Sequence, residues 1–267
     1  MEHIIHFFTN FYNHLFTWGV FENLWSGFLV VVLGYFITQI PKKRKMYRFF
    51  GFHRNFKLNV YLSALFVQDK KTPIFSHMGF NIPYKGPVVP ECEFIAISFF
   101  SRIFNLISRG DNVGSSILNK LVLGDVSVNY LNSPASSENI EHRNCICLGS
   151  ATTNSMTDLY TSRNETILSF CSKTCTIKSK DEIIGDPKGG DYAILEKIYD
   201  KETGIYVFVA AGMGISGTLA AVYYLTENWK KLEKKYKHKE FALCLRSCFY
   251  DQNPEGYKNA KIVFQNG

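Results

Sequence analysis

The chain has 267 residues, 46% of them hydrophobic, and a formal net charge of +7 from 30 basic and 23 acidic side chains. The positive charge lies largely in residues 42–57 and 230–239, where anionic lipid head groups and a solvated helix end explain it better than duplex nucleic acid does. The seven cysteines are an odd number without paired metal-ligand spacing, so they disfavour a disulfide framework or a zinc site and favour reduced cytoplasmic thiols.

The N-terminal region predicts one membrane-spanning helix. Residues 1–19 are rich in aromatic side chains, residues 24–40 form an apolar stretch, and the basic run 42–45 follows without any earlier Lys or Arg. This asymmetry predicts a single span over residues 24–40 in the inner (cell) membrane, with the C-terminal domain in the cytoplasm. A buried core helix is the alternative. The predicted division is 1–41 for the aromatic segment and span, 42–57 for a basic juxtamembrane linker and 58–267 for the soluble domain.

The soluble region alternates between strand and helix signals. A β-rich run over 58–67 precedes a loop rich in Pro and Gly over 68–90, a largely buried helix over 91–108 and a weaker helix over 116–123. Strands over 126–131 and 145–148 precede a helix start at 157–163, which Asn154 or Ser155 caps. Residues 192–199 and 205–211 predict a β-hairpin, followed by a long helix over 218–236 and strands over 241–247 and 262–264. The predicted fold is α/β: an N-terminal transmembrane helix and a Rossmann-like three-layer domain with a mainly parallel sheet and one hairpin.

The first informative turn follows the buried strand over 145–148. Its small and hydroxylated residues let the backbone approach a ligand, and free N–H groups at the helix start favour an anion such as phosphate. The ligand-binding residues predicted here are Gly149, Ser150, Thr152, Thr153 and Asn154.

The second turn joins the strand over 205–211 to the long helix and matches G-x-G-x-x-G in the context that this motif requires. The ligand-binding residues predicted here are Gly212, Gly214, Ser216, Gly217 and Thr218. The next strand ends near Arg246 instead of an acid, which disfavours NAD-dependent redox chemistry and suits a phosphate. We expect both turns to share one crevice at the carboxyl ends of the strands. An ordinary glycine-bearing strand–helix turn is the alternative for each.

Two carboxylates, Glu91 and Glu93, lie at the start of the helix over 91–108 and are the catalytic candidates. A carboxylate at the same crevice would serve to cleave the glycosidic bond of a nucleotide. The alternative is that both acids only favour the helix dipole. A serine elbow, an H-E-x-x-H motif and a Walker lysine are all absent from the sequence, so we favour a binding function over an enzyme, with a nucleotide ligand and no metal.

The order of these segments resembles the Rossmann-like, SLOG-type sensor domains of bacterial conflict systems. The resemblance rests on residues 59–63, 86–91, 148–154, 191–192 and 211–218. Such domains are associated with nucleotide-derived ligands, and their coupling to a membrane span resembles antiphage effectors of CBASS-like and Hailong-like systems. The resemblance implies a homo-oligomeric membrane effector. A nucleotide or oligonucleotide second messenger, made by a partner nucleotidyltransferase, would activate this effector to disrupt the bilayer or to open a pore or ion channel. The alternatives are a membrane-tethered nucleotide hydrolase, such as an NAD glycohydrolase, and a scaffold that recruits a partner.

Overall fold

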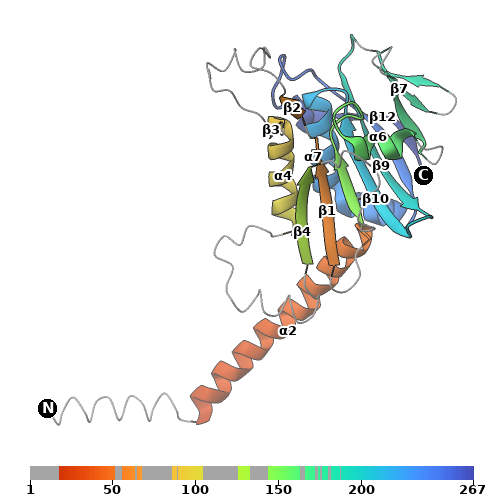
Figure 1. The fold of residues 1–267 in the computed structure, drawn as a ribbon. Helices are drawn as coiled ribbons and strands as arrows, with labels where there is room; N and C mark the ends of the chain where they lie inside the picture. The colour runs from red at the N-terminus through yellow and green to blue at the C-terminus, as the bar shows by residue number, and fades with distance from the viewer. Residues whose placement is uncertain are drawn as a thin grey trace. The chain divides into compact units, whose positions relative to one another are not determined.

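The computed structural model describes residues 18–51, 56–63, 65–67, 86–88, 90–104, 126–132, 144–162, 166–171, 174, 176–179, 182–186 and 188–267. The chain divides after Lys45 into two compact units, and the larger one is a mixed α/β domain (Figure 1). The helix predicted over 116–123 lies outside the described residues.

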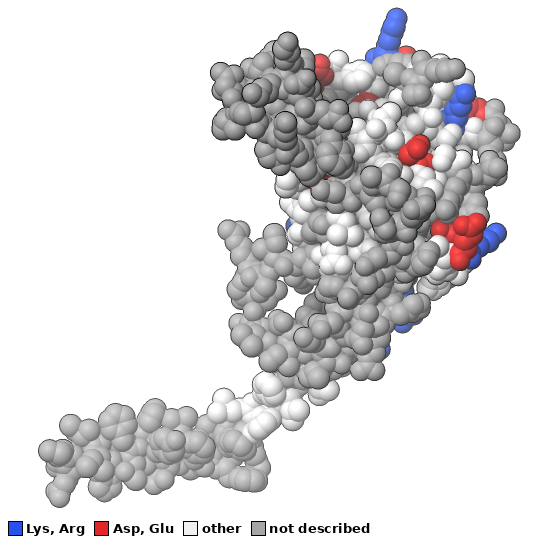
Figure 2. Space-filling view, viewed as in Figure 1, with Lys and Arg blue, Asp and Glu red and all other residues white. Residues whose placement is uncertain are grey.

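Helix α2 (Trp18–Phe49) exposes a long run of apolar side chains. These are Leu24, Trp25, Phe28, Leu29, Val30, Val31, Leu33 and Ile37, each between 48% and 72% exposed. Figure 2 shows part of this run as an uncharged surface. Within the described part of the chain, no helix has both the length and the apolar character needed to cross a membrane. The transmembrane helix predicted over residues 24–40 is therefore not supported.

The end of α2 takes the place of the predicted basic linker. The helix continues to Phe49, and Met46, Phe49 and Phe50 are all buried. Their i, i+3, i+4 spacing directs them to one side, where they join the main core of the domain. A linker was predicted because basic residues dominate positions 42–57. In the structure, the buried side chains of Met46, Phe49 and Phe50 instead attach this segment to the core. The α/β unit begins at Met46 and not at residue 58.

A seven-stranded sheet forms the centre of the domain, in the order β12-β11-β9-β10-β5-β1-β4. Its strands are β1 (Phe56–Leu62), β4 (Val126–Asn132), β5 (Cys145–Leu148), β9 (Asp191–Asp200), β10 (Ile205–Gly212), β11 (Phe241–Ser247) and β12 (Lys261–Asn266). Strands β4, β1, β5 and β10 pair in parallel, whereas β9 and β12 run against their neighbours. The mostly parallel sheet is confirmed, and the predicted hairpin is β9–β10.

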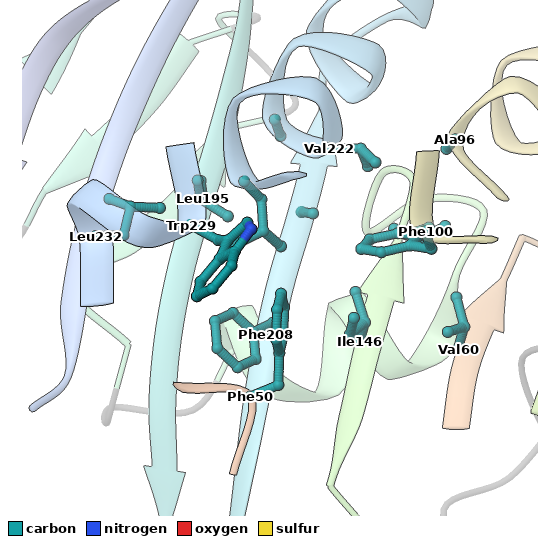
Figure 3. Close-up of a cluster of buried hydrophobic side chains, with 14 of the residues drawn as sticks. Phe50, Val60, Ala96, Phe100, Ile146, Leu195, Phe208, Val222, Trp229 and Leu232 are labelled. Carbon is teal, nitrogen blue, oxygen red and sulfur yellow. The ribbon is translucent and has the colours of Figure 1, made fainter. Parts of the chain in front are cut away.

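One face of the sheet is covered by α4 (Glu91–Phe104), α7 (Ile215–Tyr236) and the end of α2. Side chains alternate along β10, so that Phe208 belongs to this core while its neighbours Val207 and Val209 belong to the core on the opposite face. Figure 3 shows Phe208 beside Phe50, with Trp229 of α7 nearby. This core joins both helices and the end of α2 to the sheet.

The opposite face is covered by α6 (Ser155–Ser162) and a small antiparallel sheet. The small sheet contains β6 (Leu168–Cys171), β7 (Thr176–Ser179) and β8 (Ile183–Ile184). It was not predicted, because its strands are only two to four residues long and their alternation is weak. A further pair, β2 (Leu65–Val67) and β3 (Gly86–Val88), lies where the sequence predicted the end of a strand and a loop. A short 3-10 helix, η2 (Gly256–Asn259), precedes β12.

The chain leaves the sheet in opposite directions at β1 and β5. After β1 it passes through α4 on the first face to β4, and after β5 it passes through α6 on the second face toward β9 and β10. The neighbouring strands β1 and β5 therefore form a topological switch point. In open α/β sheets, ligands bind outside the carboxyl ends of the strands at such a point.

Candidate functional site

A cluster of polar side chains lies at the carboxyl ends of β1 and β5, which we call the switch-point cluster: Ser63, Glu93, Gly149, Ser150 and Thr153. Glu93 reaches in from the first turn of α4, and its Oε2 accepts a hydrogen bond of 2.7 Å from the Ser63 N–H. The Ser63 hydroxyl in turn lies 3.0 Å from the Thr153 hydroxyl. Three segments that are distant in sequence thus meet in one hydrogen-bonded group.

Gly149 allows this close approach. Its φ is +85°, a left-handed conformation that side chains rarely adopt. A Cβ at this position would lie 2.5 Å from Glu93 Oε1 and closer still to Ser63 Oγ. The turn after β5 therefore requires glycine, and the glycine brings its backbone against the Glu93 carboxyl.

The hydroxyl groups of the turn extend from the buried carboxyl to the surface. Ser150 Oγ lies 3.1 Å from Thr153 Oγ1 and 2.7 Å from Thr152 Oγ1. Ser150 and Thr153 are half-buried, whereas Thr152 is exposed. Each hydroxyl can donate or accept, so the row offers adaptable hydrogen bonds to a polar ligand.

Burial separates the two carboxylates at the start of α4. Glu93 is 1% exposed, and burial raises its pKa from 4.5 to about 7, against the lowering effect of the Ser63 hydrogen bonds. Glu91 is exposed to solvent. Near neutral pH, Glu93 therefore populates both its acid and its carboxylate form, which allows it to donate or accept a proton.

Asn154 completes the turn in a structural role. Its Nδ2 donates to the carbonyls of Tyr61 and Leu148 at 3.0 and 2.6 Å, and its Oδ1 accepts from the N–H groups of Met156 and Thr157 at 2.9 and 3.2 Å. These four bonds use the full capacity of the amide. The prediction of Asn154 as a helix cap is confirmed, and its side-chain hydrogen bonds are all made within the protein.

The glycine-rich turn after β10 binds the carboxylate of Asp191, a residue of the same chain. The Asp191 carboxylate accepts hydrogen bonds from the N–H groups of Gly214 and Gly217 at 3.0 and 2.7 Å. Asp191 is 6% exposed and lies at the start of β9. The N–H groups of Gly214 and Gly217 at this helix start therefore have an acceptor within the protein, Asp191.

The remaining residues of that turn shape the junction of β10 and α7. A Cβ on Gly212 would collide with the backbone of Gly217 and Thr218, and the Gly212 N–H donates to Thr218 Oγ1 at 3.1 Å. The Ser216 hydroxyl is buried without a hydrogen-bond partner among the described residues. These contacts explain the G-x-G-x-x-G pattern by close packing of helix and strand.

Arg246 contacts the loop before β9. It is at the end of β11, which β9 and β10 separate from β5, and its Nε donates to the Gly189 carbonyl at 2.8 Å. The turns after β5 and β10 follow neighbouring parallel strands, in register at Leu148 and Ala210. The turn after β5 lies at the switch point, the turn after β10 binds Asp191, and Arg246 contacts the loop at Gly189.

Ser63 was not selected from the sequence as a site residue. It lies inside the β-rich run predicted over 58–67, and only the structure ends β1 at Leu62 and so places Ser63 at a carboxyl end. As for metals, the described residues contain no group of three or more His, Cys, Asp or Glu side chains placed to hold an ion. Cys145 and Cys147 are both buried within β5.

Comparison with known proteins gives no further guide to this site. The chain matches no family model, no curated protein and no solved structure.

Proposed function

We propose that the α/β domain binds a nucleotide-derived signal at the switch-point cluster. The observation that carries this proposal is a buried carboxyl, Glu93, joined to Ser63 at the carboxyl ends of β1 and β5. A carboxylate at such a crevice suits the hydroxyl groups of a ribose. The hydroxyls of Ser150, Thr152 and Thr153 would contact the polar or anionic remainder of the ligand.

We further propose that ligand binding acts on a membrane through α2, in a homo-oligomeric effector like those of the antiphage systems that the sequence resembles. The exposed apolar side chains of α2 support this proposal, because a helix that exposes several large apolar side chains favours contact with lipid or with another copy of the helix. A ligand drives such a change only if it binds one assembly more tightly than the other. A second-messenger nucleotide would therefore favour the assembly that disrupts the bilayer or opens a pore.

Helix α4 offers the physical connection between the ligand and α2. Glu93 belongs to its first turn, and Phe104 ends it. The Phe104 ring lies 5.2 Å from the ring of Phe50, centroid to centroid, directly after α2. A ligand that moves Glu93 would displace α4 as a unit and repack Phe50, because well-packed cores transmit rather than absorb small shifts.

Binding is tested by calorimetry on the full-length protein with NAD, ADP-ribose and a panel of cyclic di- and trinucleotides. We expect one of these probes to bind, and Glu93→Gln to weaken its binding by at least about tenfold. The matched control is Glu91→Gln, which removes an exposed carboxylate two residues away on the same helix. Equal affinity in the wild type and Glu93→Gln would refute the site.

The effector role is tested in liposomes loaded with a fluorescent dye. The nucleotide found by calorimetry should release the dye from liposomes that contain the wild-type protein and leave those with Glu93→Gln intact. Nucleotide binding without dye release would contradict the membrane part of the proposal and retain the binding part.

The raised pKa of Glu93 favours a second function, the hydrolysis of a nucleotide such as NAD at its glycosidic bond. As a general base, Glu93 would take a proton from the water that adds to the ribose carbon as the base departs. As a nucleophile, its carboxylate would displace the base to form a ribosyl ester, which water then hydrolyses. Incubation of the full-length protein with NAD tests this directly. Release of nicotinamide that Glu93→Gln abolishes and Glu91→Gln preserves would establish the enzyme over the sensor.

A further inference from the structure

A cavity lies beside the carboxyl end of β11, apart from the switch-point cluster. Its volume is about 270 Å³, and the residues that line it are Gly189, Arg246, Ser247, Cys248, Asn253, Gly256, Asn259, Lys261 and Val263. Two of these are cationic, and none is an Asp or Glu. Strands β9 and β10 lie between β11 and β5. None of the residues that line the cavity belongs to the switch-point cluster.

The guanidinium of Arg246 is fixed at the cavity wall by the loop before β9. Its Nε donates to the Gly189 carbonyl at 2.8 Å, and its Nη2 donates to the same oxygen. Gly190, with φ at +148°, lets the loop approach this closely, because a Cβ there would lie 3.3 Å from Arg246 Nε and closer to the Ser247 carbonyl. The Nη1 group makes no hydrogen bond to any described residue, so it retains donors for a ligand.

We propose that this cavity binds the phosphate group of a small molecule. A guanidinium held in one plane matches the oxygens of a phosphate, and the Lys261 ammonium adds a second positive charge. The amide side chains of Asn253 and Asn259 add hydrogen-bond donors, and none of the described residues that line the cavity is a carboxylate that would repel a phosphate. The volume lies near the lower limit for ligand pockets, which suits a phosphate with a small organic group.

Cys248 provides a reporter within the cavity. It is exposed and lines the cavity, whereas Cys171, which is half-buried, lies on β6 and does not. The rate of alkylation of each cysteine by iodoacetamide is measured on the full-length protein by mass spectrometry of its peptides. We expect saturating pyrophosphate to slow alkylation of Cys248 by at least about fivefold and to leave Cys171 unchanged.

Two vesicle compositions separate the sources of phosphate. If lipid head groups are the natural ligand, phosphatidylglycerol vesicles will protect Cys248 and phosphatidylcholine vesicles will not. If a soluble phosphorylated molecule is the ligand, pyrophosphate will protect Cys248 and neither vesicle will.

Lys261→Gln tests the charge without disturbing the core, because Lys261 is exposed at the start of β12. We expect Lys261→Gln and Arg246→Gln each to abolish protection of Cys248. Lys258→Gln is the matched control, since Lys258 pairs with Glu255 and does not line the cavity, and it should retain protection. An unchanged rate with every probe, or equal protection in Lys261→Gln, would overturn the proposal. Either failure leaves the Glu93 dependence of nucleotide binding unaffected, so the two proposals fail separately.

Discussion

The substitution Gly149→Ala tests the geometry of the switch-point cluster. The new Cβ would lie 2.5 Å from Glu93 Oε1 and closer to Ser63 Oγ, and the residue would keep a φ of +85°. The left-handed conformation alone costs an alanine about 1 kcal/mol. Displacing two hydrogen-bonded side chains that are almost fully buried adds about 1–3 kcal/mol. We therefore expect a loss of about 2–4 kcal/mol in the free energy of unfolding.

Gly204→Ala is the matched control for this experiment. Gly204 has a similar φ of +70°, in the β9–β10 hairpin, but a Cβ there would meet only the Tyr199 hydroxyl, at 3.9 Å. It should lose only the conformational cost of about 1 kcal/mol. Urea unfolding of the two variants measures the difference. Equal losses would mean that the crowding around Glu93 and Ser63 carries no energy, and the description of the site as a close-packed carboxyl would be refuted.

Three further predictions concern buried ionisable groups, two of them on strand β9 and one on α4. Asp191→Ala should lower the free energy of unfolding, measured by urea unfolding, by about 2–4 kcal/mol, because it leaves the N–H groups of Gly214 and Gly217 without an acceptor. The control Asp158→Ala, at an exposed position, should cost less than about 0.5 kcal/mol. The pKa of Glu93 is about 7 in the folded state and 4.5 in the unfolded state, so the folded state binds more protons between these pH values and stability falls as pH rises through them. Glu93→Gln should reduce this fall in the free energy of unfolding by up to about 3 kcal/mol, measured by urea unfolding at about pH 5 and about pH 7.5. Burial lowers the pKa of Lys197 from 10.5 to about 8, so the unfolded state binds more protons between these pH values and stability rises with pH. Lys197→Met should remove a rise of up to about 3 kcal/mol in the free energy of unfolding. An unchanged dependence of that free energy on pH would contradict the burial of the ammonium.

Lys197 also explains how one strand holds several elements. Its ammonium donates to the carbonyls of Phe49 at 2.9 Å and of Lys237 at 3.3 Å, at the ends of α2 and α7. Cations are favourable at the C-termini of helices, where carbonyls lack partners. Asp191, on the same strand, binds the N–H groups at the start of α7. Strand β9 therefore satisfies both ends of that helix.

The predictions from sequence were most successful where the signal is local. The runs of apolar residues predicted β5, β10, β11 and α7 close to their observed bounds, and residues 192–199 and 205–211 predicted the β9–β10 hairpin. Residues in the turns were also predicted, because the local backbone conformation favours particular residue types there. Gly149 has a left-handed φ, and Asn154 caps α6. The small sheet of β6, β7 and β8 escaped prediction because strands of two to four residues have too little alternation to stand out.

The sequence by itself determined the α/β class, the mostly parallel sheet and the places where the chain must turn, because periodicity and glycine positions act over a few residues. Only the tertiary structure decided which polar groups meet. Asp191 fills the turn after β10 from more than twenty residues away, and burial distinguishes Glu93 from Glu91, two positions along the same helix. The physical reason is that desolvation and hydrogen bonding depend on what packs around a group, and those neighbours come from elements that no local pattern connects.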